Sequence, residues 1–463
     1  MNLPIDLRRL VGEYATSSLF DLASMMGSGF LRSHPKALTH VKLEFQDVEK
    51  ACKVVNQEMF GGVRFLKLDF TSDKDLKRLV ALAPMLEELD IGHCGGLTHT
   101  HKLGDLRRLT KLTMTGCRHF YGFSTDTLRD LELTQCAPVG GDLSSLRRLT
   151  LHNCTVQKVT KMSPVLEHLE LNANYSAVDL EDWSGDAWDL GNLPNMKELI
   201  ISTSHSLSNK HVAGVRNMRE LEKLTMTCCP EVTDFSFLQG LSKLRYLKVS
   251  NNFDWSMIKH VELESFSATE FTLEDLLHLG GQRRLQFLRL DQGRGDVVGR
   301  VDPGPILMAL LPQWPKLHTL DLFFCTQFVE TQGFPLTPGL KCLKIDFCKL
   351  ITDEKLVNLL RSFPELEMLS IKFTRVSDVG LLGLPLSIRE LALRGCVVTD
   401  KSLAVFAKLQ NLTSLDIAHT QISRVDKLPK SLKTLYITGS SLLISPDHVL
   451  TLRRRRVKIV QDY

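Results

Sequence analysis

The 463-residue sequence lacks the features that place many proteins in a membrane or outside the cell. It has no run of about 18 apolar residues, so no transmembrane helix is predicted. Its first residues have no long apolar core for a signal peptide, and Asp6, Glu13 and Asp21 interrupt the basic character of a transit peptide. The 57 basic and 53 acidic residues nearly balance, which favours neither nucleic acid nor a membrane as a general partner. These absences predict an intracellular chain, cytoplasmic or nuclear.

The motifs of the common enzyme mechanisms are also absent. The sequence contains no G-x-S-x-G, G-x-x-x-x-G-K-[ST], G-x-G-x-x-G or H-E-x-x-H segment, so it offers no catalytic residue to name. Metal sites need convergent ligands at short spacing, and there is no C-x-x-C pair. We therefore expect no enzyme activity, no cofactor and no metal, and the functional question becomes one about a binding surface.

Cysteine, by contrast, is plentiful, and its placement is regular. Eight of the eleven cysteines lie eight residues after the first apolar residue of an L-x-x-L-x-L-like segment, as Cys94 does after Leu86. Asn174 and Asn252 take this place in two other repeats. A fixed register of this kind indicates a structural repeat. The eight cysteines are Cys94, Cys117, Cys136, Cys154, Cys229, Cys325, Cys348 and Cys396.

The repeating frame covers most of the chain, with units mostly 18 to 27 residues apart. The unit assigned to Ile258 is the weakest, because it follows Leu244 by only 14 residues. Apolar and polar residues alternate in each L-x-L, as in a strand buried on one face. The first apolar positions are Leu38, Val63, Leu86, Leu109, Leu128, Leu146, Leu166, Met196, Leu221, Leu244, Ile258, Leu285, Leu317, Leu340, Leu366, Ile388, Leu412 and Leu432.

Period and pattern together resemble the leucine-rich repeat over residues 38–440. The resemblance implies an α/β solenoid, a horseshoe with a concave parallel β-sheet, in which stacked units complete one another's core. In later units Thr352-Asp353, Ser377-Asp378 and Thr399-Asp400 precede short apolar clusters, and these side chains are predicted to cap convex helices. Units with cysteine followed by I/V-T-D resemble the cysteine-containing subtype common in F-box proteins. Units such as those at Leu109 and Leu128 lack this step, which predicts a 3₁₀ or extended convex side.

The cysteine positions predict free thiols rather than disulfides. Neighbouring parallel strands lie roughly 4.8 Å apart, but side chains at one register point the same way, which is poor geometry for a disulfide. We predict buried cysteines that act as small apolar side chains and donate S–H to the loop backbone. So many thiols also indicate a reducing compartment.

Residues 1–37 precede the repeats. Pro4 stands where a first helical turn would begin, and Leu7, Leu10, Val11 and Tyr14 have helical spacing. The opening L-P-x-D-L and the second apolar segment at residues 19–25 resemble a short F-box. This resemblance implies docking on the adaptor of a cullin-RING ubiquitin ligase. The alternative is a helical cap that covers the first repeat. The residues predicted to dock the adaptor are Leu3, Pro4, Leu7, Leu10, Val11 and Tyr14.

Two further segments depart from the repeat. An insertion between Asn174 and Pro194 combines acidic residues with two tryptophans, and it predicts either a loop that anchors a basic partner or tryptophans that fold back on the convex surface. The arginine cluster near the C-terminus predicts an import signal, a phosphate contact, or arginines beside a last strand formed by Leu450, Leu452, Val457 and Ile459. The predicted binding residues are Asp179, Glu181, Asp182, Trp183 and Trp188 in the insertion and Arg453, Arg454, Arg455 and Arg456 in the tail.

The largest predicted binding surface is the concave side of the sheet. Strand alternation turns the third, fifth and seventh position of each repeat to this side. These positions are acidic in early repeats, as at Asp90 and Glu198, and aromatic with mixed charge from the middle on. A face that binds RNA would be basic throughout, so a protein partner or a merely solvated sheet is expected. The residues predicted to bind the partner are Tyr246, Lys248, Phe287, Arg289, Phe323, Lys344 and Arg394.

The sequence thus predicts a non-catalytic protein–protein interaction scaffold in three parts: a cap or F-box-like segment at 1–37, a solenoid at 38–440 and a C-terminal cap with a basic tail at 441–463. The resemblance implies, more specifically, a substrate-recognition subunit of a cullin-RING ubiquitin ligase. The alternative is a structural or assembly subunit of a large ribonucleoprotein, ciliary or cytoskeletal complex. Partners are predicted to be proteins, with nucleic acid only at the basic tail and no membrane.

Overall fold

A computed structural model describes most of the repeat region. The described residues are 40–43, 62–68, 73–97, 100–117, 120–121, 126–136, 139–154, 156–172, 193–203, 207–250, 253–293, 302–326, 334–425, 427–439 and 445–460. The predicted adaptor-docking residues at 1–37 and the acidic insertion lie outside them. The chain forms two compact units, one up to Lys243 and one from Leu244, called unit 1 and unit 2 below.

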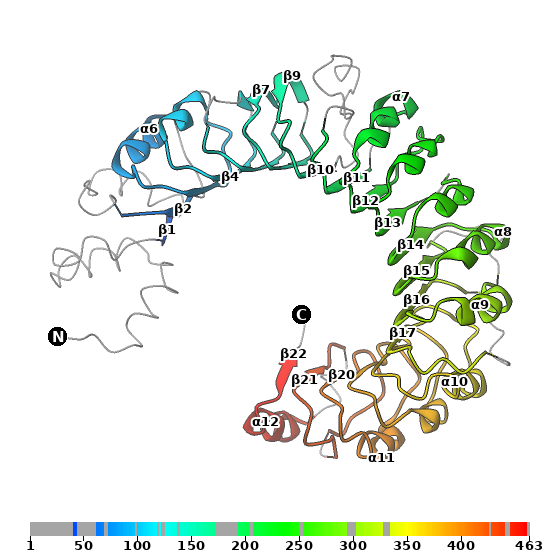
Figure 1. Ribbon diagram of the computed structural model, residues 1–463. Helices are drawn as coiled ribbons and strands as arrows, with labels where there is room; N and C mark the ends of the chain where they lie inside the picture. Colours follow the sequence, from blue (N-terminus) through cyan, green and yellow to red (C-terminus); the bar gives the residue numbers. More distant parts are fainter. Residues whose placement is uncertain are drawn as a thin grey trace. The chain divides into compact units, whose positions relative to one another are not determined.

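Unit 1 contains a sheet in which each strand runs parallel to the next (Figure 1). On the opposite side of the core lie short helices and a second, three-stranded parallel sheet. The strands of the main sheet are β1 (His40–Leu43), β2 (Phe65–Leu68), β3 (Glu88–Ile91), β4 (Lys111–Thr115), β6 (Asp130–Thr134), β8 (Arg148–His152), β10 (His168–Asn172), β11 (Glu198–Ser202) and β12 (Lys223–Thr227).

The outer side of unit 1 is helical at its two ends and extended between them. Strands β5 and β7 follow the units at Leu109 and Leu128, so the extended convex side predicted for these repeats is confirmed. The outer elements are α6 (Asp73–Leu82), η1 (Thr100–Asp105), β5 (Phe120–Tyr121), β7 (Val139–Leu143), β9 (Val156–Met162), α7 (Asn209–Val212), η5 (Ala213–Asn217) and η6 (Ser236–Gly240).

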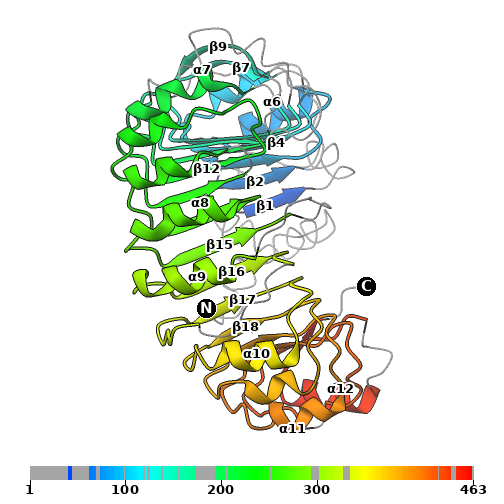
Figure 2. The same cartoon turned by 90° about the vertical axis from the view of Figure 1, so that its right-hand side faces the viewer.

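Unit 2 repeats the plan, with strands that are again parallel to their neighbours (Figure 2). Helices lie on one side of this sheet, and the other side, called the inner face below, carries none of the described helices. The strands are β13 (Tyr246–Val249), β14 (Ser265–Thr269), β15 (Phe287–Asp291), β16 (Thr319–Phe323), β17 (Cys342–Lys344), β18 (Met368–Ser370), β19 (Glu390–Ala392), β20 (Ser414–Asp416), β21 (Thr434–Tyr436) and β22 (Lys458–Val460). The helices are η7 (Trp255–His260), α8 (Leu273–Leu277), η8 (His278–Gly281), α9 (Gly304–Leu310), η9 (Leu311–Gln313), α10 (Asp353–Leu360), η10 (Gly380–Gly383), η11 (Asp400–Ser402), α11 (Leu403–Phe406) and α12 (Pro446–Arg454).

The predicted frame fixes where the strands begin. A strand starts two residues after each predicted first apolar position, as β15 does after Leu285, with one exception. The unit assigned to Ile258 was wrong: Ile258 is buried in η7, and β14 begins two residues after Leu263. The error arose because Ile258 has leucine-like spacing but belongs to the helical side of the preceding unit.

Leucines at equivalent positions form the core. Leu288, Leu320 and Leu343 lie on neighbouring strands in register, and each is at most 1% exposed. Full burial of one such side chain contributes about 1.5–3 kcal/mol. Because each repeat buries its leucines against its neighbours, stability is nearly a sum of nearest-neighbour contacts.

The prediction for the cysteine positions is confirmed. All eight are buried, between 0% and 7% exposed, and free. The thiol typically donates to a carbonyl of the preceding repeat, as in Cys348 Sγ to Leu322 O at 3.4 Å and Cys396 Sγ to Ile371 O at 3.0 Å. Desolvation raises the pKa of the Cys94 thiol to about 12.

The Thr-Asp steps do more than the predicted capping. Thr399 caps η11, but the Thr352 side chain makes no capping bond to α10. Instead, each aspartate reaches the next repeat: Asp353 accepts from the Ser377 amide at 2.7 Å and from its hydroxyl at 2.5 Å. The same bonds run from residue 399 to Asp378 and from residue 423 to Asp400. These aspartates therefore fasten successive repeats together.

The C-terminal cap is a helix followed by a strand. The predicted strand at Ile459 is confirmed, because β22 pairs with β21. Leu450 and Leu452 were wrongly predicted to share that strand, since both lie in α12. Proline at the first helical turn and a buried Leu452 explain why a helix forms here.

The predicted fold class, a leucine-rich-repeat solenoid with a parallel β-sheet, is confirmed. Among the described segments, no helix has both the length and the apolar character needed to cross a bilayer.

Candidate binding surface

The predicted binding residues of unit 2 lie on the inner face, where alternation turns them away from the core. Strand β15 shows the pattern: Phe287, Arg289 and Asp291 are half-exposed, whereas the two leucines between them are buried. Strand β16 differs, because Asp321 at the same register is only 3% exposed.

Parallel pairing aligns these side chains in rows across the strands. One row runs Lys248, Ser267, Arg289, Asp321 and Lys344, one residue from each successive strand. Cations thus stand on every second strand, roughly 9.6 Å apart at the usual strand spacing. A second row runs from Tyr246 through Ser265 to Phe287. Ser265 of β14 lies between Tyr246 and Phe287 in this row.

Arg289 is the centre of this surface. Its guanidinium lies 3.2 Å from Asp321 Oδ2 and 3.6 Å from Asp291 Oδ2, and 5.0 Å from the ring centroid of Phe323. Burial raises the pKa of the Asp321 carboxyl, while Arg289 and Lys344 oppose that rise. The two carboxylates and the ring hold the guanidinium in one place, so it forms a rigid, partly exposed contact point.

The remaining predicted residues of the inner face differ in environment. Lys248 is exposed, and Tyr246 and Lys344 are half-exposed. Arg394 follows β19, four strands from Arg289, which is roughly 19 Å at the usual strand spacing. The Nε of Arg394 is buried with no hydrogen-bond partner, a deficit of about 1–3 kcal/mol. The structure therefore joins most of the predicted set around Arg289 and leaves Arg394 apart.

The acidic row predicted for unit 1 is largely engaged within the sheet. Lys67 Nζ lies 2.5 Å from Asp90 Oδ2. The buried His168 lies 2.8 Å from a Glu198 carboxylate oxygen and 3.8 Å from one of Glu170. Because Lys67 pairs with Asp90 and Lys223 Nζ lies 3.8 Å from Glu198 Oε1, this row is less anionic toward a partner than the sequence suggests.

Sequence reasoning missed a set of aromatic side chains at the edge of the inner face. Phe324, Phe347 and Phe373 occupy the eighth position of consecutive repeats, each with a left-handed backbone (φ 53°, 60° and 54°). Their rings stack at centroid distances of 4.4 and 4.7 Å. Non-glycine residues pay roughly 1–2 kcal/mol for this backbone conformation. The available signal was phenylalanine at one frame position in three successive repeats.

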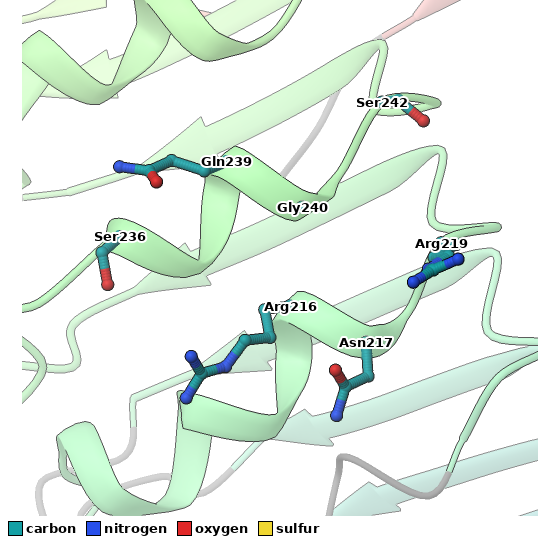
Figure 3. Close-up of a pocket in the computed structure, with 7 residues that line it drawn as sticks. All are labelled: Arg216, Asn217, Arg219, Ser236, Gln239, Gly240 and Ser242. Atoms are coloured by element: carbon teal, nitrogen blue, oxygen red, sulfur yellow. The ribbon is translucent and has the colours of Figure 1, made fainter.

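Unit 1 carries an open hollow of about 640 Å³ on its outer side, between η5 and η6. Figure 3 shows Arg216 and Arg219 on either side of Asn217, with their guanidinium groups apart. Arg216 Nε donates to the Ala213 carbonyl. Because the charged groups do not converge, this hollow is a weaker candidate than the inner face.

Comparison with solved structures bears on the fold. An internalin from Listeria monocytogenes aligns with TM-score 0.33 and 16% identity, over 84% of this chain and 93% of that one. An LRR protein from Leptospira interrogans aligns with TM-score 0.37 and 15% identity, over 94% and 98%. The TLR13–ssRNA13 complex aligns with TM-score 0.50 and 16% identity, over 87% of this chain and 56% of that one. No protein-family model and no curated protein matches the sequence.

The fold is that of the leucine-rich repeat. Parallel register, the leucine core and the TLR13 alignment agree on this. The Arg289 cluster and the stacked rings of Phe324, Phe347 and Phe373 both lie on the strand side of the repeat units.

The basic tail of this leucine-rich-repeat chain is only partly exposed. Arg453 and Arg454 end α12 as exposed side chains, and Arg456 is exposed with φ 61°. Arg455 instead donates to the Leu428 carbonyl at 3.3 Å and to that of Pro429. One of the four arginines therefore holds the C-terminal cap to the preceding repeat.

Proposed function

We propose that this chain is a non-catalytic protein-interaction scaffold that holds its partner on the inner face of unit 2. The observation that carries the proposal is the Arg289 cluster, in which a guanidinium is fixed against Phe323 and two carboxylates beside half-exposed Phe287 and Tyr246. Aromatic side chains and arginine in a rigid setting are the residues that dominate protein-binding energy.

A protein partner fits this surface better than RNA, although one neighbouring fold was solved with ssRNA. RNA affinity depends on cations that are free to neutralise phosphates. Arg289 is already paired with Asp321 and Asp291, so the middle of the face carries little net positive charge. The intracellular location proposed from the sequence agrees with eight buried, free thiols.

The more specific form of the proposal is an F-box-like substrate receptor of a cullin-RING ubiquitin ligase. Its support is the L-P-x-D-L opening and the helical spacing of Leu7, Leu10, Val11 and Tyr14. The alternative is a structural or assembly subunit of a large complex. That alternative is favoured by the exposed Arg453 and Arg454 on α12, which a docking subunit would present to its neighbours.

Affinity purification distinguishes these forms. The full-length chain and a version without residues 1–35 are each purified from cells, and the bound proteins are identified by mass spectrometry. Cullin and its adaptor with the full-length chain alone would support the receptor. A stoichiometric set of structural proteins, with no cullin in either sample, would overturn the receptor and support the architectural subunit.

A charge reversal tests the binding surface itself. Lys248→Glu changes an exposed cation on the inner face, and Lys259→Glu makes the same change in η7 on the outer side. We expect the first variant to lose the co-purified partner and the second to retain it. Equal retention by both variants would contradict an inner-face site.

A further inference from the structure

The phenylalanine ladder, defined as Phe324, Phe347 and Phe373, is more than a requirement of the fold. In other repeats the same left-handed position is occupied by glycine, as at Gly116 and Gly395, or by other non-phenylalanine residues, as at Thr203 and His419. Glycine adopts this backbone without strain, so the solenoid can be built without an aromatic residue there. The left-handed backbone is therefore a general feature of the repeat, and what distinguishes these three repeats is their run of stacked aromatic rings.

Phe373 forms one end of the ladder, called the open end below, and is the most exposed of the three rings. This ring is 39% exposed, and it leans over Gly395: a Cβ added to Gly395 would lie 2.5 Å from it. The Phe373 amide donates to the Arg394 carbonyl at 2.8 Å, which fixes Phe373 beside Arg394. The open end is thus an aromatic surface next to a cation.

The carboxylates near this end are already engaged. Asp346 accepts from the Ser370 hydroxyl at 2.6 Å and from the Lys372 amide at 2.8 Å. Asp416 lies 3.5 Å from Lys372 Nζ. None of the ion pairs among the described residues includes Arg394, and its buried Nε has no hydrogen-bond partner. Arg394 is therefore a cation beside the ladder that no ion pair among the described residues neutralises.

We propose that the open end of the phenylalanine ladder, together with Arg394, binds an acidic peptide segment in which an apolar or aromatic side chain adjoins a carboxylate. The apolar side chain packs against the exposed part of the Phe373 ring. The carboxylate accepts from Arg394, which lacks an acceptor in the free protein. This inference rests on the proposed scaffold function and names the partner chemistry of one part of the inner face.

A phage-displayed random peptide library, selected on the full-length chain, tests the proposal. We expect enriched peptides to carry Asp or Glu next to Phe, Trp or Leu. Synthetic copies should bind Phe373→Gly and Arg394→Gln about tenfold more weakly than the wild type, as expected for contact residues of a small site. Leu382→Ala, at a 70% exposed leucine of η10 on the outer side, is the matched control and should bind as the wild type does.

The outcomes separate this inference from the proposed function. Enriched peptides without acidic residues, or no enrichment, would overturn the ladder site. Peptides that bind both ladder variants normally but fail on Lys248→Glu would overturn it as well, while supporting the inner face as a binding surface. Glycine accepts φ 54° at residue 373, so Phe373→Gly is expected to fold, as thermal unfolding can verify. If it does not fold, Arg394→Gln decides the question.

Discussion

The position eight residues after the first apolar residue of each repeat favours a small side chain that donates to the backbone. Several residue types meet this need. Cysteine occupies this position in eight repeats, and Thr374 and Thr420, which the cysteine pattern did not reveal, occupy it in two others. Thr374 Oγ1 donates to Ile371 O at 2.8 Å, and Thr420 Oγ1 donates to Ile417 O at 2.6 Å. The pattern is therefore set by hydrogen-bonding geometry rather than by thiol chemistry.

Thiol reactivity should reflect this role. Because desolvation raises the pKa of Cys94 to about 12, its thiolate becomes abundant only near that pH. Cys228 directly precedes the buried Cys229 but is itself exposed. We expect iodoacetamide at neutral pH to alkylate Cys228 in the native protein and to modify Cys94 only after unfolding, as peptide mass spectrometry would show. Equal labelling of the two in the native state would contradict the burial described above.

Among elements, contacts between successive repeats are local and specific. The aspartates of the Thr-Asp steps bond to the next repeat, and in unit 1 the turns η5 and η6 pack closely on the outer side. The sequence predicted the Thr-Asp steps as features of single helices. Spacing along one repeat cannot show which group of the next repeat an aspartate will meet, and so these bonds were missed.

Asp378→Ala should destabilise unit 2 by about 2 kcal/mol, because the carboxylate accepts from the Thr399 amide, the Thr399 hydroxyl and Ser402. Burial raises the pKa of Asp378, but these hydrogen bonds outweigh it and leave the pKa below its ordinary value. The contribution is therefore complete above about pH 4, the ordinary pKa, and is lost as the pH falls through the folded-state pKa. Urea unfolding at several pH values measures both effects. An unchanged difference between wild type and variant across acidic pH would contradict them.

Gly240→Ala tests the contact between η5 and η6. An added Cβ would lie 2.5 Å from the Arg216 carbonyl oxygen, and this backbone atom cannot move without shifting the turn. We expect a loss of about 1–3 kcal/mol in thermal or denaturant unfolding. Gly281→Ala is the matched control, because nothing lies within 4 Å of its added Cβ. Comparable losses in both variants would show that the close approach is not the cause.

For the molecule as a whole, the sequence predicted the architecture because the same leucine spacing recurs in many successive repeats. Leucine spacing placed the main-sheet strands of both units except β14 and β22, and the error at Ile258 fell where the spacing was least regular. The candidate site was only partly predictable. Alternation placed Arg289 and Phe323 on one face but did not show that they touch. The stacking of Phe347 on Phe324 depends on a left-handed backbone that spacing does not encode.

Because stability is nearly a sum of nearest-neighbour contacts, a destabilising substitution at the end of unit 2 is expected to affect only the adjacent repeats. Arg455→Ala removes the bonds to the Leu428 and Pro429 carbonyls. We expect the amide of Ile437, which donates to Val460 O of β22, to exchange about 30-fold faster, corresponding to roughly 2 kcal/mol. Amides of β16 should keep their rates, and Arg454→Ala, at an exposed arginine, should change neither. Faster exchange throughout unit 2 would indicate cooperative unfolding instead.

At each position of the phenylalanine ladder, the left-handed backbone costs stability while the ring supplies a surface for binding. Glycine at residue 324, 347 or 373 would relieve backbone strain and remove a ring. A screen that rewards heat resistance alone would weigh that relief only against the lost ring stacking and would ignore any partner that the rings contact. Engineering of this chain should keep these three phenylalanines and seek stabilising substitutions on the outer helices.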